Sequence, residues 1–209
     1  MPKMIFWDVD TQYDFMMPDG KLYVPWAEEI IPNLARLTNY ARKQRIPILG
    51  SVDYHATDDP ELSDTPDFHG TFPPHCLRGT PGQEKIPATR PLHPLLVESR
   101  LYPEGDLEKT VADHTGEVIF RKQRFDVFSN PNVDRVLGII QPDEIVVYGV
   151  ALDVCDAYAI EGLLKRRASH LTLVHDATKP IYENKGQELV EKWKREGVRV
   201  TTTAEITKE

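Results

Sequence analysis

The 209-residue sequence has only two cysteines, Cys76 and Cys155, which are far apart and form no C-x-x-C pair. A disulfide framework or a cysteine-rich zinc ribbon needs more cysteines at close spacing, so we expect two free thiols. The sequence also lacks a basic excess, because its formal net charge at pH 7 is -8 and its acidic residues are dispersed. This charge argues against a protein that binds nucleic-acid phosphates.

Long apolar runs are missing as well. No run approaches the roughly 20 residues that cross a bilayer, and the N-terminal "MPKMIFWDVD" has no signal-like cleavage pattern. We therefore expect no membrane association and a cytoplasmic location. The length and the 40% content of hydrophobic residues fit a single domain, which we place over residues 1–209.

Short apolar, β-branched runs alternate with longer amphipathic ones, a pattern typical of strand–helix units around a parallel sheet. The predicted strands are 4–9, 46–52, 117–121, 144–150, 170–175 and 198–202. The predicted helices are 28–44, 132–141, 153–168 and 186–197. The fold class is therefore α/β, a doubly wound, Rossmann-like three-layer α/β/α arrangement with a mostly parallel sheet of about six strands. Residues 56–116 have no clear period and are expected to form a long irregular active-site segment, either a functional loop or one with short elements that the sequence does not place.

Reactive side chains follow four of the predicted strands. Asp10 follows the first strand, Asp53 and His55 the second, Lys122 the third and Cys155 the fourth. Ligands of open parallel sheets bind beyond the carboxyl ends of the strands. We therefore expect these side chains to meet at one edge of the sheet.

Cys155 has two interpretations. A buried structural cysteine is the commoner fate of a lone Cys. A helix N-terminus and a nearby lysine such as Lys122, however, would lower the pKa of the thiol. With Asp10 available as a general base at the same edge, the nucleophile becomes the favoured interpretation.

Asp53 and His55 are two residues apart at a strand end, so their side chains can point the same way. A further histidine from the irregular segment could complete a metal site, and His75 in "FPPHC" is preferred to His69 and His93. One carboxylate and two imidazoles suit a divalent metal ion, zinc above all, with iron and manganese as alternatives. The alternative interpretation is that Asp53 and His55 form a surface D-x-H pair that binds no metal.

Three phenylalanines, Phe15, Phe72 and Phe125, lie within a few residues of these groups. They could bind a substrate by stacking on a planar ring, and packing in the core is the alternative.

The motifs that contain these residues resemble those of the isochorismatase-like cysteine hydrolases, and within them the nicotinamidase/pyrazinamidase group. "DVDTQYDF" resembles the D-x-Q-x-D-F segment with its catalytic aspartate at Asp10. "KQRFDVF" resembles the segment with the catalytic lysine, at Lys122, and "GVALDVC" the segment with the nucleophile, at Cys155. The D-x-H pair and "HCLRGTPG" resemble the metal-ligand segments of nicotinamidases. The resemblance covers most of the chain.

The resemblance implies hydrolysis of a small carboxamide, first of all nicotinamide to nicotinate and ammonia, through a cysteine thioester. It also implies an oxyanion hole from the backbone N–H groups of Ala151 and Cys155, a cis peptide before Ala151, and a homo-oligomer. Another amidohydrolase of this family with a different small amide, or a non-catalytic binding protein on the same fold, remain as alternatives.

Several features depart from the family pattern, among them a longer segment between "GTPG" and Lys122. The second histidine of D-W-H-P-x-x-H is absent from "DYHATDD", and Phe72 stands in place of a stacking tryptophan. Asp126 and Val127 replace a serine–alanine pair, and Asp156 follows the nucleophile. An acid at position 156 would oppose ionisation of the thiol unless its side chain caps the helix.

Overall fold

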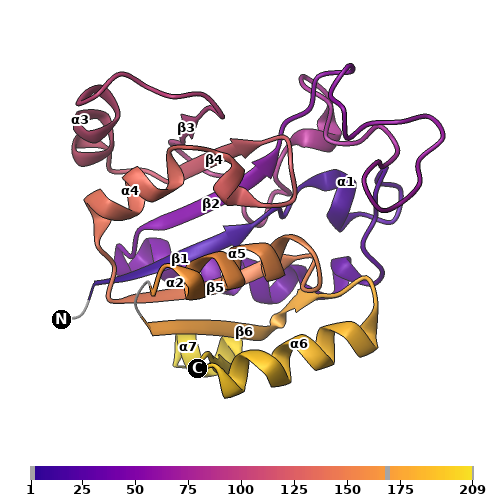
Figure 1. Ribbon diagram of the computed structural model, residues 1–209. Helices are drawn as coiled ribbons and strands as arrows, with labels where there is room; N and C mark the ends of the chain where they lie inside the picture. Colours follow the sequence, from indigo (N-terminus) through magenta and orange to yellow (C-terminus); the bar gives the residue numbers. More distant parts are fainter. Residues whose placement is uncertain (1–2, 168–169, 209) are drawn as a thin grey trace.

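The computed structural model describes residues 3–167 and 170–208, and its centre is a sheet of parallel strands. Within the described residues the sheet has seven strands in the order β3-β4-β2-β1-β5-β6-β7 (Figure 1). The strands are β1 (Met4–Val9), β2 (Ile48–Asp53), β3 (Leu95–Val97), β4 (Val118–Lys122), β5 (Glu144–Val150), β6 (His170–Lys179) and β7 (Arg199–Thr201). The predicted doubly wound α/β class is confirmed, with one strand more than the six expected.

Helices cover both faces of the sheet, with α4 and α5 in front and α2 behind in Figure 1. The front face carries α3 (Asp106–Asp113), α4 (Val133–Ile140), α5 (Cys155–Lys165) and α6 (Glu183–Arg195). The rear face carries α1 (Tyr13–Met16), a 3-10 turn (Ala27–Ile30), α2 (Ile31–Gln44) and α7 (Thr203–Thr207). None of the helices within the described ranges is long and apolar enough to cross a membrane.

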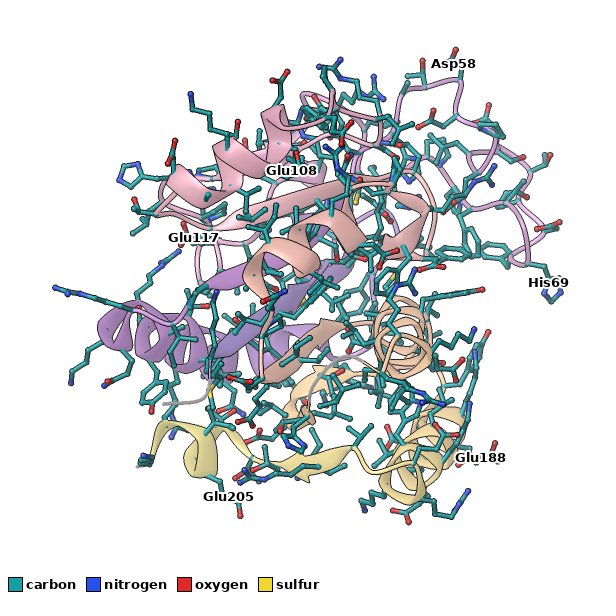
Figure 2. The ribbon with its side chains drawn as sticks, turned by 60° about the vertical axis from the view of Figure 1, so that its left-hand side comes forward. Asp58, His69, Glu108, Glu117, Glu188 and Glu205 are labelled. Carbon is teal, nitrogen blue, oxygen red and sulfur yellow. The ribbon has the colours of Figure 1, made fainter. Side chains whose placement is uncertain are left out.

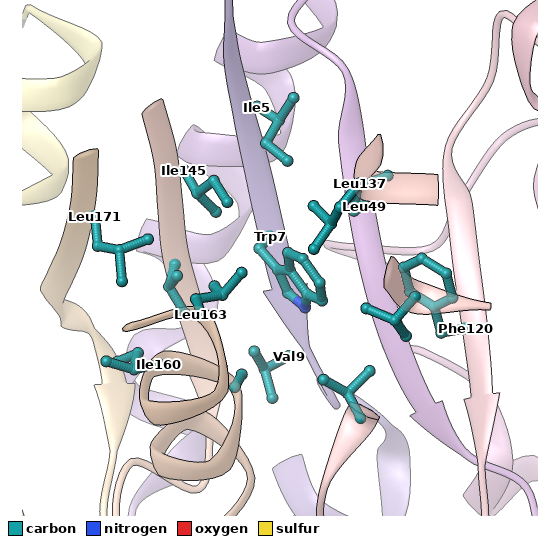
Figure 3. Close-up of a cluster of buried hydrophobic side chains, with 14 of the residues drawn as sticks. Ile5, Trp7, Val9, Leu49, Phe120, Leu137, Ile145, Ile160, Leu163 and Leu171 are labelled. Carbon is teal, nitrogen blue, oxygen red and sulfur yellow. The ribbon is translucent and has the colours of Figure 1, made fainter. Parts of the chain in front are cut away.

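The core under the front helices is centred on Trp7 of β1 (Figure 3). The Trp7 ring stacks at 5.9 Å on Phe120 of β4. Its neighbour Phe6 points to the opposite face, where its ring meets Tyr148 edge-on at 6.0 Å. Both faces of β1 are therefore buried, which explains why the parallel strands read as continuous apolar runs.

The predicted irregular segment 56–116 contains regular structure. It includes a 3-10 turn (Pro81–Gln83), β3 and α3. These are short elements of the kind that the sequence left open for this segment, and they produce no visible period by which they could be placed. The short α7 was also not predicted, and the end of the predicted helix 153–168 lies outside the described residues.

The strand order changes direction at β1, which lies between β2 and β5. In Figure 1 the arrowhead of β2 points to the loops after residue 53, beyond the carboxyl edge of the sheet. Asp58 and His69 lie on the outer side of these loops (Figure 2). Gly149 permits β5 to approach β1 here, because its φ is 133° and a Cβ would lie 2.0 Å from the carbonyl oxygen of Val9.

Candidate active site

Asp10, Lys122 and Cys155 lie together beyond the carboxyl edge of the sheet. They follow β1, end β4 and begin α5, respectively. The Nζ atom of Lys122 is 2.8 Å from Asp10 Oδ2 and 3.9 Å from Cys155 Sγ. All three side chains are buried, so their interactions are only weakly screened by water.

For Lys122 and for Cys155 alike, burial and the neighbouring opposite charges shift the pKa in opposite directions. Burial disfavours the charged form of Lys122, but Asp10 and Asp53 raise its pKa well above the ordinary value, so the ammonium is retained. Burial raises the pKa of the Cys155 thiol well above its ordinary value, and Lys122 offsets this only in part. The lowered thiol pKa expected from the helix N-terminus and Lys122 is therefore not found in the resting site, because burial outweighs both. The resting thiol holds its proton.

Asp10 is held in a fixed orientation. Its Oδ1 accepts a hydrogen bond of 2.7 Å from the Ser51 hydroxyl, while Oδ2 faces Lys122. The backbone of Asp10 is left-handed, with φ at 45°, a region that few non-glycine residues occupy and that is frequent at functional sites.

Asp53 ends β2, and the side chain of Gln12 fixes its backbone. The amide group of Gln12 accepts from Asp53 N at 2.6 Å and donates to Asp53 O at 2.8 Å. Gln12 belongs to the D-x-Q pattern, for which the sequence alone indicates no role.

Asp53, His55 and His75 place three ligand atoms within 4.8 Å of one another, and all three residues are buried. Asp53 Oδ2 lies 4.0 Å from His55 Nε2 and 3.6 Å from His75 Nε2. None of these three atoms has a hydrogen-bond partner among the described residues. Burying three unpartnered polar atoms is costly, and a shared cation would satisfy all of them.

The other ring nitrogen of each histidine is already engaged. His55 Nδ1 lies 3.2 Å from Asp59 Oδ2, and His75 Nδ1 lies 2.8 Å from the carbonyl oxygen of Pro73. Both partners accept hydrogen bonds, so Nδ1 donates and the lone pair of a neutral ring is on Nε2. Such outer partners orient metal-ligating histidines in proteins. Asp59 stands where the family pattern has its second histidine.

A cavity of about 490 Å³ opens onto Cys155 and Asp53. Phe15, Phe72 and Phe125 line it, so all three predicted substrate-binding residues face the site. The Phe15 ring lies 5.5 Å from the ring of His75, and the Phe72 ring lies 4.9 Å from that of Phe125. Ala151 also lines the cavity, and the Val150–Ala151 peptide is cis.

Two buried acids near the site were not predicted as part of it. Glu61 lies in the irregular segment, and burial together with the Asp53 charge raises its pKa to about 7. Asp156 does not cap α5 but accepts a hydrogen bond of 2.6 Å from the Thr178 hydroxyl. Burial raises the pKa of Asp156 to about 8, so near neutral pH it is mainly uncharged and does not oppose a thiolate. No sequence signal marked Glu61, because only the loop fold buries it.

The fold and this site define a doubly wound α/β protein with a cysteine-centred site at its switch point. The family model described as "Isochorismatase domain" matches residues 5–102 and 101–205. The chain belongs to the isochorismatase family.

Similar proteins include the nicotinamidase/pyrazinamidase of Mycobacterium tuberculosis (strain ATCC 25618 / H37Rv), which is 33% identical over 84 residues. That match spans 38% of this chain and 42% of the relative, less than half of either. The pyrazinamidase of Pyrococcus horikoshii in complex with zinc is 22% identical, with a TM-score of 0.74 over 96% of this chain and 99% of that one. PnC1 from L. infantum, in complex with nicotinate, is 19% identical, with a TM-score of 0.73 over 97% and 94% of the two chains.

Proposed function

We propose that the protein hydrolyses a small primary carboxamide to a carboxylic acid and ammonia through a thioester on Cys155, with nicotinamide as the first candidate. The observation that carries this proposal is the position of the Lys122 ammonium between the Asp10 carboxylate and Cys155 Sγ. A carboxylate and a cation directly behind a thiol that lines the cavity are parts that activate a cysteine nucleophile.

The first step is removal of the thiol proton. Because burial raises the pKa of the Cys155 thiol, a base must take its proton before the sulfur attacks. Asp10 is that base, since Ser51 and Lys122 hold its carboxylate beside the thiol. The Lys122 ammonium and the N-terminus of α5 then stabilise the thiolate.

The thiolate attacks the carboxamide carbon, and the backbone N–H groups of Ala151 and Cys155 receive the negative charge on the oxygen. Loss of one such donor typically costs about 3 kcal/mol of transition-state stabilisation. Asp10 returns the proton to the nitrogen, the C–N bond breaks and ammonia leaves, which forms the thioester. Water then attacks the thioester carbon while Asp10 takes a proton from it, the C–S bond breaks and the carboxylic acid leaves, and Asp10 returns the proton to the Cys155 sulfur.

Asp53, His55 and His75 would hold a divalent metal ion, because their three buried, unpartnered atoms converge. When bound, the metal would supply a Lewis-acid position for a ring nitrogen of the substrate. Zinc is the first candidate, in line with the zinc complex of the P. horikoshii relative, and iron and manganese are alternatives. Phe15 and Phe72 flank the same cavity and would stack on the ring.

The nicotinamidase/pyrazinamidase from M. tuberculosis and the nicotinate complex of the L. infantum protein support nicotinamide as the first substrate to test. The experiment measures ammonia release from nicotinamide by the metal-loaded protein and by Cys155→Ala. We expect release by the wild type and a loss of at least about 10³-fold in the variant. Ammonia release from other small primary amides but not from nicotinamide would overturn nicotinamide as the substrate and would still support amide hydrolysis through Cys155. Absence of release from every amide would overturn both.

A further inference from the structure

The cavity is larger than one aromatic ring needs. Its volume is about 490 Å³, whereas a cavity of roughly 150 Å³ is enough to hold benzene. A single ring between Phe15 and Phe72 therefore leaves much of the cavity unfilled.

The unfilled part has an apolar outer wall. Among the described residues, eight large apolar or aromatic side chains are exposed, and four of them line this one cavity. We call these four the outer wall: Phe68, Tyr158, Ile181 and Tyr182. Gathering exposed apolar side chains at one concave site is typical of a binding surface.

Two residues of the outer wall, Phe68 and Tyr158, continue the inner aromatic surface. The ring of Phe68 meets Phe72 edge-on at 6.2 Å, and Phe72 meets Phe125 edge-on at 4.9 Å. Phe125 in turn stacks on Tyr158 at 6.3 Å. Aromatic side chains therefore line a path from the inner ring position to the mouth of the cavity, where they can contact a second planar group.

Two sets of hydrogen bonds hold the outer wall in place. The carboxylate of Asp153 accepts from the backbone N–H groups of Ile181 and Tyr182, at 2.7 and 3.1 Å. Phe68, whose φ is 56°, is kept in its turn by a bond from its N–H to the carbonyl oxygen of Thr71 at 3.0 Å. Because these residues are already held in place, they lose less conformational entropy when a ligand binds.

In the mechanism proposed above, the spare volume lies on the acyl side of the scissile bond. Asp10 and Lys122, which would face the leaving nitrogen, are fully buried and do not line the cavity. A substituent on the amide nitrogen would have no room there. The outer wall can therefore be reached only by a substituent on the acyl group.

We propose that the preferred substrate is a primary aromatic carboxamide whose ring carries a second ring or a similarly large apolar group, which the outer wall binds. This inference rests on the proposed amidase function, which sets the orientation of the substrate in the cavity. The test is designed to distinguish failure of outer-wall binding from failure of the amidase function.

The test has a binding arm and a kinetic arm. The binding arm uses calorimetry with metal-loaded Cys155→Ala and compares nicotinate with phenyl-substituted nicotinates, the phenyl group placed at each free ring carbon in turn. We expect at least one substituted acid to bind about tenfold more tightly than nicotinate, a typical gain for an added aromatic contact and its burial.

In the same background, Phe68→Ala and Tyr182→Ala should each reduce this preference for the substituted acid at least threefold. The matched control is Leu101→Ala, an exposed apolar residue outside the cavity, which should leave the preference unchanged.

The kinetic arm compares kcat/KM of the wild-type protein for the corresponding amides. A substituted amide with kcat/KM above that of nicotinamide supports the inference. If no substituted acid binds more tightly than nicotinate, or if the outer-wall variants change nothing, the inference is overturned even when nicotinamide is hydrolysed. If tight, outer-wall-dependent binding occurs without any ammonia release, the outer wall is a binding site for the second ring, but the amidase function fails and with it the assignment of this ligand as a substrate.

Discussion

Asp53 presents one carboxylate oxygen to the Lys122 ammonium and the other to the two imidazoles of the candidate metal site. Oδ1 pairs with Lys122, and Oδ2 lies 3.6 Å from His75 Nε2. One carboxylate thus belongs both to the acid–lysine–thiol group and to the metal-ligating set. A mutation can therefore separate the two sets only at a residue that belongs to one of them.

Replacing His55 should remove the metal and leave the nucleophile. His55→Ala takes away one of three ligand atoms, while the contacts of Lys122 with Asp10 and Cys155 do not involve His55. We expect elemental analysis to give about one metal ion per chain in the wild type and less than about a tenth of that in the variant. His69→Ala is the matched control, because His69 is exposed and outside the three-residue set (Figure 2). Equal metal content in all three proteins would contradict the ligand assignment.

The two thiols should differ in reactivity. Cys155 lines the cavity, whereas Cys76 is fully buried and its Sγ faces the carbonyl oxygen of Gly82. In the folded protein we expect iodoacetamide to modify Cys155 at least about tenfold faster than Cys76, measured by peptide mass spectrometry. Cys155→Ala should abolish the fast phase and Cys76→Ala should retain it. Similar rates at both residues would argue against a reactive Cys155.

Asp156 should make the wild type less stable as pH rises. Its pKa is raised to about 8 by burial, from an ordinary value near 4, so between these values the folded state holds a proton that the unfolded state releases. The free energy of unfolding therefore falls with increasing pH across this window, by up to about 1.4 kcal/mol per pH unit, and levels off above pH 8.

Asp156→Asn has no such proton. The melting temperature of the variant minus that of the wild type should therefore rise from pH 4 to pH 8 and then stay constant. A difference that does not change with pH would show that Asp156 is ionised in the folded protein.

Lys85 should stabilise the loop that follows β1. Its Nζ lies 3.0 Å from Asp8 Oδ2 and 3.1 Å from Thr11 Oγ1, and the pair with Asp8 is buried. Lys85→Met leaves Asp8 buried without its cation, so we expect the free energy of unfolding to drop by about 3–5 kcal/mol in urea titrations. The control Lys179→Met breaks an exposed pair with Glu29 and should cost no more than about 1 kcal/mol. Equal losses would mean that burial does not set the energy of the Lys85 pair.

The long strands and the residues directly after them could be predicted from the sequence. β1, β5 and the start of β6 are apolar runs at their observed positions, and parallel strands bring their carboxyl ends to one edge. This rule alone was enough to expect Asp10, Lys122 and Cys155 near one another.

What the sequence could not predict depends on contacts that have no local pattern. β3 has only three residues and its partner β4 begins some twenty residues later. The charge states of Cys155, Glu61 and Asp156 follow from burial, which is a property of the assembled fold. The outer wall likewise combines residues of the irregular segment, α5 and the loop before α6.

The most direct test of the proposed chemistry is acid quenching during turnover of nicotinamide, followed by mass spectrometry of the peptides. We predict that at early times the peptide containing Cys155 gains the mass of one nicotinoyl group, and that Cys155→Ala gains none and releases no ammonia. Ammonia release by Cys155→Ala at a rate within tenfold of the wild type, with no modified peptide in either protein, would contradict the account.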